Sequence, residues 1–570
     1  MPLPTTGDYA LSAQDVVSFT FGKPDYDTDR PVFIDATDPS HSLSYRQAKD
    51  LVQKLIAGFH AEGLNAGDRV CIHAYNSIYY PIICLAIVGC GGVSVGTNPT
   101  YTSHELAHAL KLAQPRFVVT ESEAAPSLQK ALSSTGRGET TPVFLLDAQA
   151  GMRGDNGGKH SPRSWQTLLS HGSRPWKTFP DRTTAIETTA CLFYTSGTTG
   201  LPKCAMTSHH NLVAEHQLFY ERNPRRYPFR AVLSMPFFHI GVLPTVLISQ
   251  LREGRHCYIM RRFELEPFLA YHARYDVTEA FLVPPMILRI VMSGLSDPAS
   301  PNYKYSLRSV KNGYSGAAPC SPEVLKRFQS LLAKGATMSQ IWGMTETTSV
   351  ATTVPPDLLG AAAAGQIDVA GTVGTALPTL TLKLVDEQGE DVSHGGRGQL
   401  CVKGPTVTQG YFENEKATRE SFDSDGYFHT GDVVEVDVKS GLLSVVDRAK
   451  ELIKVRGFQV APAELESTLL SHPHIVDAGV VGVKLSDENQ QEEEVPRAYV
   501  VRRDGVDAAQ MLTEEEVQAF VRARLASYKA LAGGVQFVDA LPKLANGKIL
   551  RRVLREWGAA TRRAATSSKL

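Results

Sequence analysis

The sequence lacks several features that would point to a particular class of protein. Its 58 Lys and Arg residues balance 59 Asp and Glu residues, so the formal charge is -1. That balance gives no overall attraction to nucleic acid or to an anionic membrane. The eight cysteines contain no Cys-x-x-Cys pair, which excludes the common zinc-ribbon and thioredoxin motifs. They are too sparse for a disulfide scaffold, and we expect them to be mostly buried and reduced.

Long apolar runs are missing as well. The most apolar stretch, residues 82–95, is interrupted by Gly89, Gly91 and Gly92 and is too short to cross a bilayer. It predicts a buried helix that runs into a strand. The first eight residues have neither a basic start nor an apolar segment, so we expect no signal peptide and no membrane span.

What the chain contains is an alternation of helix and strand patterns over its first 360 residues. Ser44 precedes an apolar stripe at helical spacing, and Thr102 with Glu105 forms a capping-box pattern before another helix. Short apolar runs at residues 70–72 and 117–120 predict strands. Alternating strands and helices predict an α/β fold in which helices cover parallel sheets.

The pattern changes near residue 371. Short strand patterns there predict a small β-rich subdomain, and a compact α+β segment follows residue 447. We therefore expect a large N-terminal domain over residues 1–447 and a small C-terminal domain over residues 448–570. The last thirty residues are basic but carry little aromatic character, which favours a phosphate-facing loop and a solvated tail over RNA binding.

One segment carries a phosphate-binding pattern. Residues 194–203 read Tyr-Thr-Ser-Gly-Thr-Thr-Gly-Leu-Pro-Lys and follow an apolar strand pattern. Glycines let backbone N–H groups approach an anion, hydroxyls add donors, and Lys203 adds a positive charge. The spacing differs from the Walker A motif. Taken alone, the segment is also compatible with a plain surface turn.

Five further motifs follow it. They are Ser315-Gly-Ala-Ala-Pro319, residues 340–346, residues 427–432, residues 447–458 and the loop 541–548. The six motifs in this order resemble the acyl-adenylate-forming superfamily, in the branch of 4-coumarate:CoA ligase, firefly luciferase and medium-chain acyl-CoA synthetase. The resemblance runs from about residue 44 to residue 552.

The resemblance implies ATP, CoA and Mg²⁺ as cofactors and assigns roles to residues. The phosphate contacts would be Thr195, Ser196, Gly197, Thr198, Thr199, Gly200 and Lys203, with Thr345 at the α-phosphate. Gly316, Ala317 and Ala318 would border the adenine and Trp342 would stack on it, with Gln340 and Gly343 as further nucleotide contacts in the same motif as Trp342. Asp432 and Arg448 would contact the ribose. Glu346 would hold Mg²⁺. Lys450 would be the hinge of a mobile small domain, and Gly457 would lie on the loop near the pantetheine tunnel.

The same resemblance places the acid beside His239, Ile240, Gly241, Gly313, Tyr314, Gly316 and Thr347. Two departures from the usual pattern matter. Cys204 follows Lys203 where Gly is usual, which could leave a thiol near the phosphates. Gly313 would open room in the acid pocket and Tyr314 would take some away. The pocket of a coumarate ligase should therefore not be assumed. The leading hypothesis from the resemblance is an ATP-dependent acid:CoA ligase whose acid is moderately hydrophobic, of the aryl, arylacetic or medium-chain class.

These residue types suit the implied chemistry. A carboxylate attacks the α-phosphorus of ATP, forms a mixed anhydride and expels pyrophosphate, so positioned cations supply most of the catalysis. The candidate catalytic residues are Lys548, Lys203, Thr345 and His239. Lys548 would bridge the carboxylate and the α-phosphate. CoA would then take its place after the small domain moves.

Other interpretations stay open at this point. The chain could be a free-standing adenylating enzyme for a separate carrier protein, a luciferase-like oxygenase, or a non-catalytic nucleotide-binding protein. Residues 92–96 match the G-x-S-x-G motif of serine hydrolases, but valines flank Ser94 and predict a strand instead. The final Ser568-Lys569-Leu570 matches the peroxisomal address, and predicts an import receptor as partner, a peroxisomal location and a secondary-metabolite or acid-degradation pathway.

Overall fold

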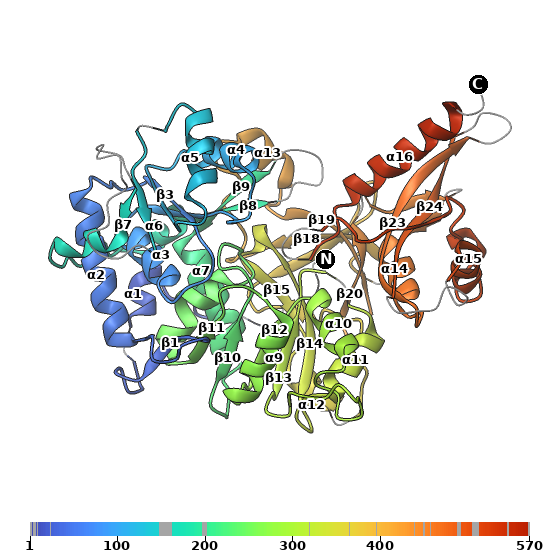
Figure 1. Ribbon diagram of the computed structural model, residues 1–570, viewed down its shortest axis with the longest axis horizontal. Helices are drawn as coiled ribbons and strands as arrows, with labels where there is room; N and C mark the ends of the chain where they lie inside the picture. Colours follow the sequence, from blue (N-terminus) through green and yellow to red (C-terminus); the bar gives the residue numbers. More distant parts are fainter. Residues whose placement is uncertain are drawn as a thin grey trace.

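The structure, a computed structural model, describes the chain apart from residues 1–2, 4–6, 8, 23, 139, 148–161, 196–201, 319, 364, 395, 438, 449–450, 456–457, 487–491, 504–511, 544–546 and 568–570. Two large sheets and a smaller four-stranded sheet form the main body, and a separate C-terminal unit projects from it (Figure 1). The predicted α/β fold with a large N-terminal and a small C-terminal domain is confirmed. The exact boundary at residue 447 stays a prediction.

The first large sheet has seven strands. In spatial order they are β7 (Arg163–Ser164), β6 (Val143–Leu145), β5 (Phe117–Thr120), β3 (Arg69–His73), β4 (Val93–Gly96), β8 (Thr189–Thr195) and β9 (Lys203–Ser208). All neighbours are parallel except β8 and β9, which are antiparallel. That pair sets Thr195 opposite Lys203. The two ends of the predicted phosphate loop are therefore held together by a sheet ladder.

The second large sheet has nine strands. In spatial order they are β16 (Thr375–Ala376), β15 (Ser349–Thr353), β14 (Thr337–Met344), β13 (Asn312–Ser315), β12 (Glu279–Leu282), β10 (Arg230–Leu233), β11 (His256–Ile259), β1 (Pro31–Asp35) and β2 (Ser42–Ser44). Strands β12, β13 and β14 are parallel, and their register places Leu282, Ser315 and Gln340 side by side. Carboxyl ends of parallel strands are where open α/β sheets bind ligands.

Helices cover both sheets (Figure 1). They are α1 (Val16–Thr20), α2 (Tyr45–Ala61), α3 (Tyr80–Gly89), α4 (Ser103–Ala113), α5 (Ala125–Ser134), α6 (Arg182–Glu187), α7 (His209–His216), α8 (Gln250–Glu253), α9 (Leu265–Arg274), α10 (Pro284–Ser293), α11 (Pro322–Ser330), α12 (Pro356–Ala363) and α13 (Glu415–Ser421). The 3-10 helices η1 (Trp165–Ser170) and η4 (Thr345–Thr347) and the π-helices η2 (Gln217–Glu221) and η3 (Thr245–Ser249) accompany them. Capping boxes begin α2 at Ser44 and α4 at Thr102, as the sequence predicts. The described helices include none that is both long and apolar enough for a membrane span.

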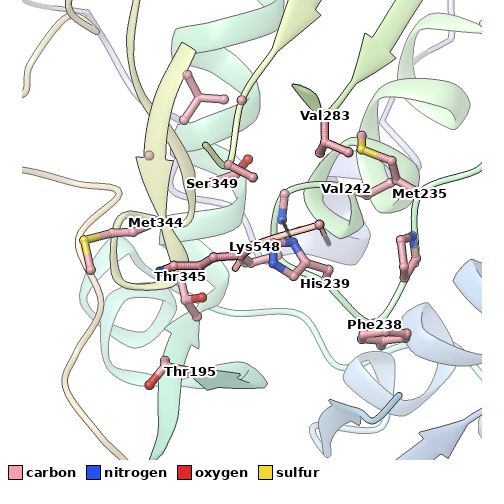
Figure 2. A pocket seen from close by; sticks show the side chains of 18 of the residues that line it. Thr195, Met235, Phe238, His239, Val242, Val283, Met344, Thr345, Ser349 and Lys548 are labelled. Carbon is pink, nitrogen blue, oxygen red and sulfur yellow. Dashed lines mark hydrogen bonds between the residues drawn. The ribbon is translucent and has the colours of Figure 1, made fainter. Parts of the chain in front are cut away.

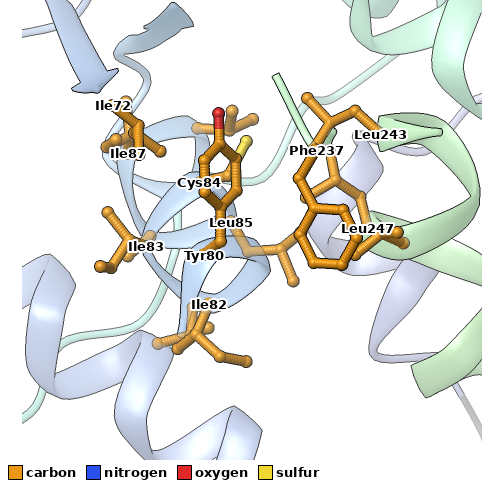
Figure 3. Close-up of a cluster of buried hydrophobic side chains, with 14 of the residues drawn as sticks. Ile72, Tyr80, Ile82, Ile83, Cys84, Leu85, Ile87, Phe237, Leu243 and Leu247 are labelled. Atoms are coloured by element: carbon orange, nitrogen blue, oxygen red, sulfur yellow. The ribbon is translucent and has the colours of Figure 1, made fainter. Parts of the chain in front are cut away.

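Helix α3 forms the centre of the main hydrophobic core. It is buried on every side and continues into β4, which confirms the prediction for residues 82–95. Figure 3 shows its side chains packed against Phe237, whose ring meets Tyr80 edge-on at 5.8 Å. Ser94 is 3% exposed within β4, so the G-x-S-x-G match is a buried strand and not a nucleophile on a sharp turn. All eight cysteines are buried and free.

The β-rich subdomain is an antiparallel sheet of β17 (Thr381–Val385), β18 (Arg397–Lys403), β19 (Phe428–Val436) and β20 (Leu443–Arg448). The C-terminal unit follows with β21 (Ile453–Val455), β22 (Phe458–Val460), α14 (Pro462–Leu470), β23 (Ile475–Ser486), β24 (Glu492–Arg502), α15 (Glu514–Arg522), η6 (Ser527–Lys529), β25 (Val535–Phe537) and α16 (Arg551–Ser567). Its core joins α14 and α15 to the sheet of β23, β24 and β25.

The basic end of the chain, expected as a phosphate-facing loop and a solvated tail, contains a helix. Residues 551–567 form helix α16. Its first residue is Arg551. It forms ion pairs with Glu451 at 2.7 Å and with Glu466, and it donates a hydrogen bond to the carbonyl oxygen of Val480. The local run of basic residues hid these acidic partners, which are distant in the sequence.

Candidate active site

A cavity of about 820 Å³ lies at the carboxyl ends of β12 to β14, facing the β8–β9 pair. Both domains line it. The predicted site residues on its wall are Thr195, Lys203, His239, Ile240, Gly241, Tyr314, Gly316, Ala317, Gly343, Thr345, Glu346, Arg448 and Lys548. Motifs separated by more than 300 residues thus meet around one space, which is the arrangement that a two-substrate reaction requires.

The phosphate side of the cavity combines a cation, a carboxylate and a phenol. Lys203 begins β9, and its ammonium lies 4.8 Å from the ring centre of Tyr411. The Tyr411 hydroxyl donates to Glu346 Oε1 at 2.8 Å. Burial raises the pKa of the Glu346 carboxyl, and the Tyr411 hydrogen bond opposes that effect. Tyr411 therefore connects the two groups that would act on the phosphates.

The Glu346 carboxylate suits a magnesium ion. One oxygen accepts from Tyr411, which orients the group, and a single protein carboxylate is typical where substrate phosphates and water complete the Mg²⁺ shell. The described residues contain no cluster of three or more His, Cys, Asp or Glu side chains that could form a self-sufficient metal centre. A metal here would depend on the nucleotide.

A second polar group sits where β19 and β20 pair. Asp432 accepts from Arg448 Nε at 3.0 Å through one oxygen and from Trp342 Nε1 at 2.9 Å through the other. Trp342 is 7% exposed and packs in the core between the second large sheet and the β-rich sheet. Each Asp432 oxygen keeps a lone pair that could accept from a ribose hydroxyl. The stacking of Trp342 on adenine stays a prediction.

Lys548 enters the cavity from the small domain. In Figure 2 its side chain runs past Thr345 and His239. Burial is the main cause that lowers the pKa of Lys548 to about 8, and the nearby Arg448 lowers it further. The carboxylates of Glu451 and Asp432 oppose these two effects. A buried ammonium on the wall of a cavity can also interact with a ligand that carries negative charge.

His239 lies on the acid side of the cavity, in the turn after β10. The backbone N–H of Gly241 donates to His239 Nδ1 at 3.1 Å. Burial lowers the pKa of His239 to about 4, so the imidazole is neutral near pH 7. Because Nδ1 accepts a hydrogen bond, the proton resides on Nε2. His239 can donate to a substrate oxygen but adds no positive charge.

The acid side is otherwise mostly apolar. Phe281 and Tyr314 stack with ring centres 5.6 Å apart, and Phe238, Val242 and Val283 complete this part of the wall (Figure 2). Aromatic and branched side chains in this arrangement favour a flat or compact apolar group next to the carboxylate.

Gly313 requires a correction. A side chain at Gly313 would point at Met338, with its Cβ 2.4 Å from the sulfur, and Gly313 is absent from the described lining of the cavity. Adjacent residues in a strand face opposite sides, so only Tyr314 reaches the acid. The extra room expected from Gly313 does not exist, whereas Tyr314 does occupy space at the wall.

Cys204 also departs from its expected role. Its side chain is 3% exposed and packs with Val93, Val95 and Leu192. Burial raises the pKa of its thiol to about 12. The thiol therefore faces the core of the first large sheet and is a neutral packing group.

Several predicted residues stand behind the wall. Gln340 accepts from the backbone N–H of Cys320 at 2.9 Å, and Thr347 Oγ1 accepts from the backbone N–H of Met344 at 2.9 Å. Ala318 is described but is not among the lining residues. Ser196, Gly197, Thr198, Thr199, Gly200, Lys450, Gly457 and Ser568-Lys569-Leu570 lie outside the described residues. Their roles stay predictions.

Sequence reasoning missed Tyr411 and the polar groups behind Tyr314. Tyr411 follows Gly410 in a segment that pairs with β9, where Phe412 N–H donates to the carbonyl of Cys204 at 2.8 Å. No candidate site residue predicted from the sequence lies near Gly410 or Tyr411 along the chain. Only the sheet contact brings its phenol to Glu346.

Comparisons with known proteins agree with this geometry. A model described as "AMP-binding enzyme" matches residues 24–412, and one described as "AMP-binding enzyme C-terminal domain" matches residues 464–548. The acyl-CoA ligase azaF and the phenylacetyl-CoA ligase epaB of Aspergillus niger are each 42% identical, over 96% of this chain and 99% and 98% of their own lengths. The nicotinic acid-CoA ligase pyr1 of Aspergillus fumigatus is 35% identical over 94% of both chains.

Solved structures show the same likeness. ATP-bound MatB from Rhodopseudomonas palustris, 27% identical, superposes with a TM-score of 0.79 over 95% of this chain and 98% of its own. Apo MatB, with the same coverage, superposes with a TM-score of 0.70. This chain therefore superposes more closely on the ATP-bound structure of MatB than on its apo structure.

Proposed function

The chain belongs to the AMP-binding enzyme family and is an AMP-forming acyl-CoA synthetase, and from this premise we propose that its substrate is a moderately hydrophobic aryl, arylacetic or medium-chain carboxylic acid. One observation carries the proposal. Lys548, Thr345 and the aromatic acid side line one cavity, so an acid held by the apolar wall has its carboxylate beside the nucleotide groups. The relatives named as phenylacetyl-CoA and nicotinic acid-CoA ligases support an aryl or arylacetic acid.

The first half-reaction joins the acid to AMP. The acid carboxylate attacks the α-phosphorus of ATP, and pyrophosphate leaves. Lys548 would hold the carboxylate and an α-phosphate oxygen together, while Thr345 and Lys203 contact the phosphates. The neutral His239 would donate a hydrogen bond from Nε2 to the acid. Because it carries no positive charge, it would not compete with Lys548 for the acid carboxylate. Catalysis by such a site rests on positioning and on charge stabilisation.

Magnesium is part of the proposal. Glu346, oriented by Tyr411, would hold the ion against the nucleotide phosphates. The ion supplies positive charge that stabilises the phosphoryl oxygens.

The second half-reaction transfers the acyl group to CoA. Lys548 occupies the cavity in this structure. It must therefore leave before the CoA thiol can take its place. Lys548 belongs to the C-terminal unit, in which Arg551 is anchored by ion pairs to Glu451 and Glu466. We expect that unit to move as a whole, with Lys450 as its hinge.

The experiment that tests the substrate proposal is acid-dependent ATP–pyrophosphate exchange across a library of carboxylic acids. Exchange confined to aryl, arylacetic or medium-chain acids supports the proposal, and CoA-dependent release of AMP with the same acids completes it. Lys548→Gln serves as the control, because it should lose exchange while the protein stays folded. Exchange only with short or strongly polar acids would overturn the proposed class.

We also propose a peroxisomal location and a role in a secondary-metabolite or acid-degradation pathway. The support is Ser568-Lys569-Leu570, a tripeptide that import receptors recognise at a chain end. A fluorescent protein fused in front of the full chain should gather in peroxisomes, and removal of the three residues should disperse it. Identical distributions of the two fusions would refute the location.

A further inference from the structure

A buried charged cluster lies behind the aromatic wall of the acid pocket. Glu279 is 0% exposed and accepts three hydrogen bonds, from Arg225 Nε at 2.6 Å, from the Tyr227 hydroxyl at 2.6 Å and from Asn312 Nδ2 at 2.9 Å. Three donors satisfy a buried carboxylate that would otherwise be costly. The side chains of this cluster are therefore held in place, unlike those of an exposed ion pair.

The cluster reaches the acid pocket through one side chain. Arg225 Nη2 donates to the Tyr314 hydroxyl at 2.7 Å. Tyr314 lines the cavity, whereas Arg225, Tyr227, Glu279 and Asn312 are absent from its described lining. The ring of Tyr314 thus separates the cavity from the charges behind it.

The other contacts of Tyr314 act on its ring. Phe281 stacks on it at 5.6 Å, and Phe219 lies 5.1 Å away at a tilted angle. These apolar contacts pack against the ring, in the offset and tilted arrangements that aromatic pairs prefer. The hydrogen bond from Arg225 is directional. In the part of the chain that the structure describes, this bond holds the hydroxyl end of the Tyr314 ring.

We propose that Arg225 is a positioning residue for acid selectivity. Arg225 is held by Glu279 and fixes the position of the Tyr314 phenol. Phe281 and Tyr314 then form a rigid wall of the acid pocket. This wall accepts a flat ring and excludes a straight acyl chain that is long enough to contact it. This inference rests on the proposed function, since it concerns the acid side of the same cavity. Its consequence is that a charge outside the cavity controls which acids react.

The test compares two probes, phenylacetate and octanoate, by ATP–pyrophosphate exchange. The variant Tyr314→Phe keeps the ring and the Arg225–Glu279 pair and removes only the hydroxyl. We expect the ratio of kcat/KM for phenylacetate to that for octanoate to fall about tenfold, the usual scale of one lost hydrogen bond to a charged group. The KM for ATP should not change, because the ring contacts only the acid side.

Two further variants separate positioning from general loosening. Tyr227→Phe removes another donor to Glu279 without touching Tyr314 and should leave the ratio unchanged. Arg225→Lys keeps a positive charge near Glu279 but loses the two-pronged geometry, and should shift the ratio as Tyr314→Phe does. If Arg225→Lys does not fold, the comparison of Tyr314→Phe with Tyr227→Phe still decides.

The outcomes are distinct. No exchange by the unmodified enzyme with either probe or any related acid would overturn the proposed substrate class and, with it, this inference. A ratio unchanged in Tyr314→Phe, or shifted equally in Tyr227→Phe, would overturn the inference while the substrate class stands.

Discussion

Lys548 gives the site a pH dependence that can be derived from its surroundings. Burial and Arg448 lower the pKa of its ammonium to about 8 in the free enzyme. If the positive charge of Lys548 bridges the acid and the α-phosphate, adenylation requires the protonated form. Activity should then be full well below pH 8 and fall as the pH rises through that value.

The size of the effect follows from the titration. One pH unit above the pKa, about one tenth of Lys548 is charged, so kcat/KM for ATP should drop about tenfold between pH 7 and pH 9. Bound phosphates next to the ammonium stabilise its charge and raise its pKa. The fall in kcat at saturating ATP should therefore occur at a higher pH than the fall in kcat/KM.

The assay is pyrophosphate exchange without CoA, since the thiol of CoA itself ionises in the alkaline range and would obscure the result. Lys548→Arg is the matched variant, because a guanidinium stays charged throughout this range. Its rate should be lower but should show no alkaline fall. A flat profile of the unmodified enzyme to pH 10, or the same fall in Lys548→Arg, would refute the reasoning.

Three other predictions concern Trp342, Tyr411 and Cys204. Trp342→Phe removes the donor to Asp432 at 2.9 Å, and should raise the KM for ATP about fivefold while leaving the KM for the acid unchanged; equal changes in both would contradict it. Tyr411→Phe keeps the ring beside Lys203 and loses the bond to Glu346. It should weaken magnesium-dependent ATP binding about tenfold in calorimetry without acid, and unaltered binding would refute the positioning role. Iodoacetamide at pH 8 should leave Cys204 unmodified by mass spectrometry, because its thiol is buried with a pKa of about 12; rapid alkylation of the folded protein would disagree.

Local signals in the sequence were sufficient for much of the fold. Ser44 and Thr102 define helix starts because a capping box is complete within four residues. The strand at residues 117–120 is predicted to the residue. The sequence did not reveal the ion pairs of Arg551 with Glu451 and Glu466, which lie about 100 and 85 positions away, because no local pattern shows such partners.

The site divides in the same way. Motif residues such as Glu346 and Lys548 could be named from the sequence because each motif is contiguous. Gly313 was assigned to the wrong side because a strand pattern gives alternation but not which face meets the cavity. Tyr411 and Arg225 were missed because their hydrogen-bond partners, Glu346 and Tyr314, lie 65 and 89 positions away in the sequence. Only the folded chain brings these residues together.

Gly547, next to Lys548, lies at a close contact between the small domain and the large domain. It has a φ of +83°, and a Cβ there would lie 2.6 Å from Cγ of Pro285, at the start of α10. Both the backbone conformation and the contact exclude a side chain. The added methyl group of Gly547→Ala would thus clash with Pro285 and hold the two domains apart at this contact. The nucleotide-binding groups would remain intact while Lys548 failed to seat, which would separate substrate capture from adenylation in a single chain.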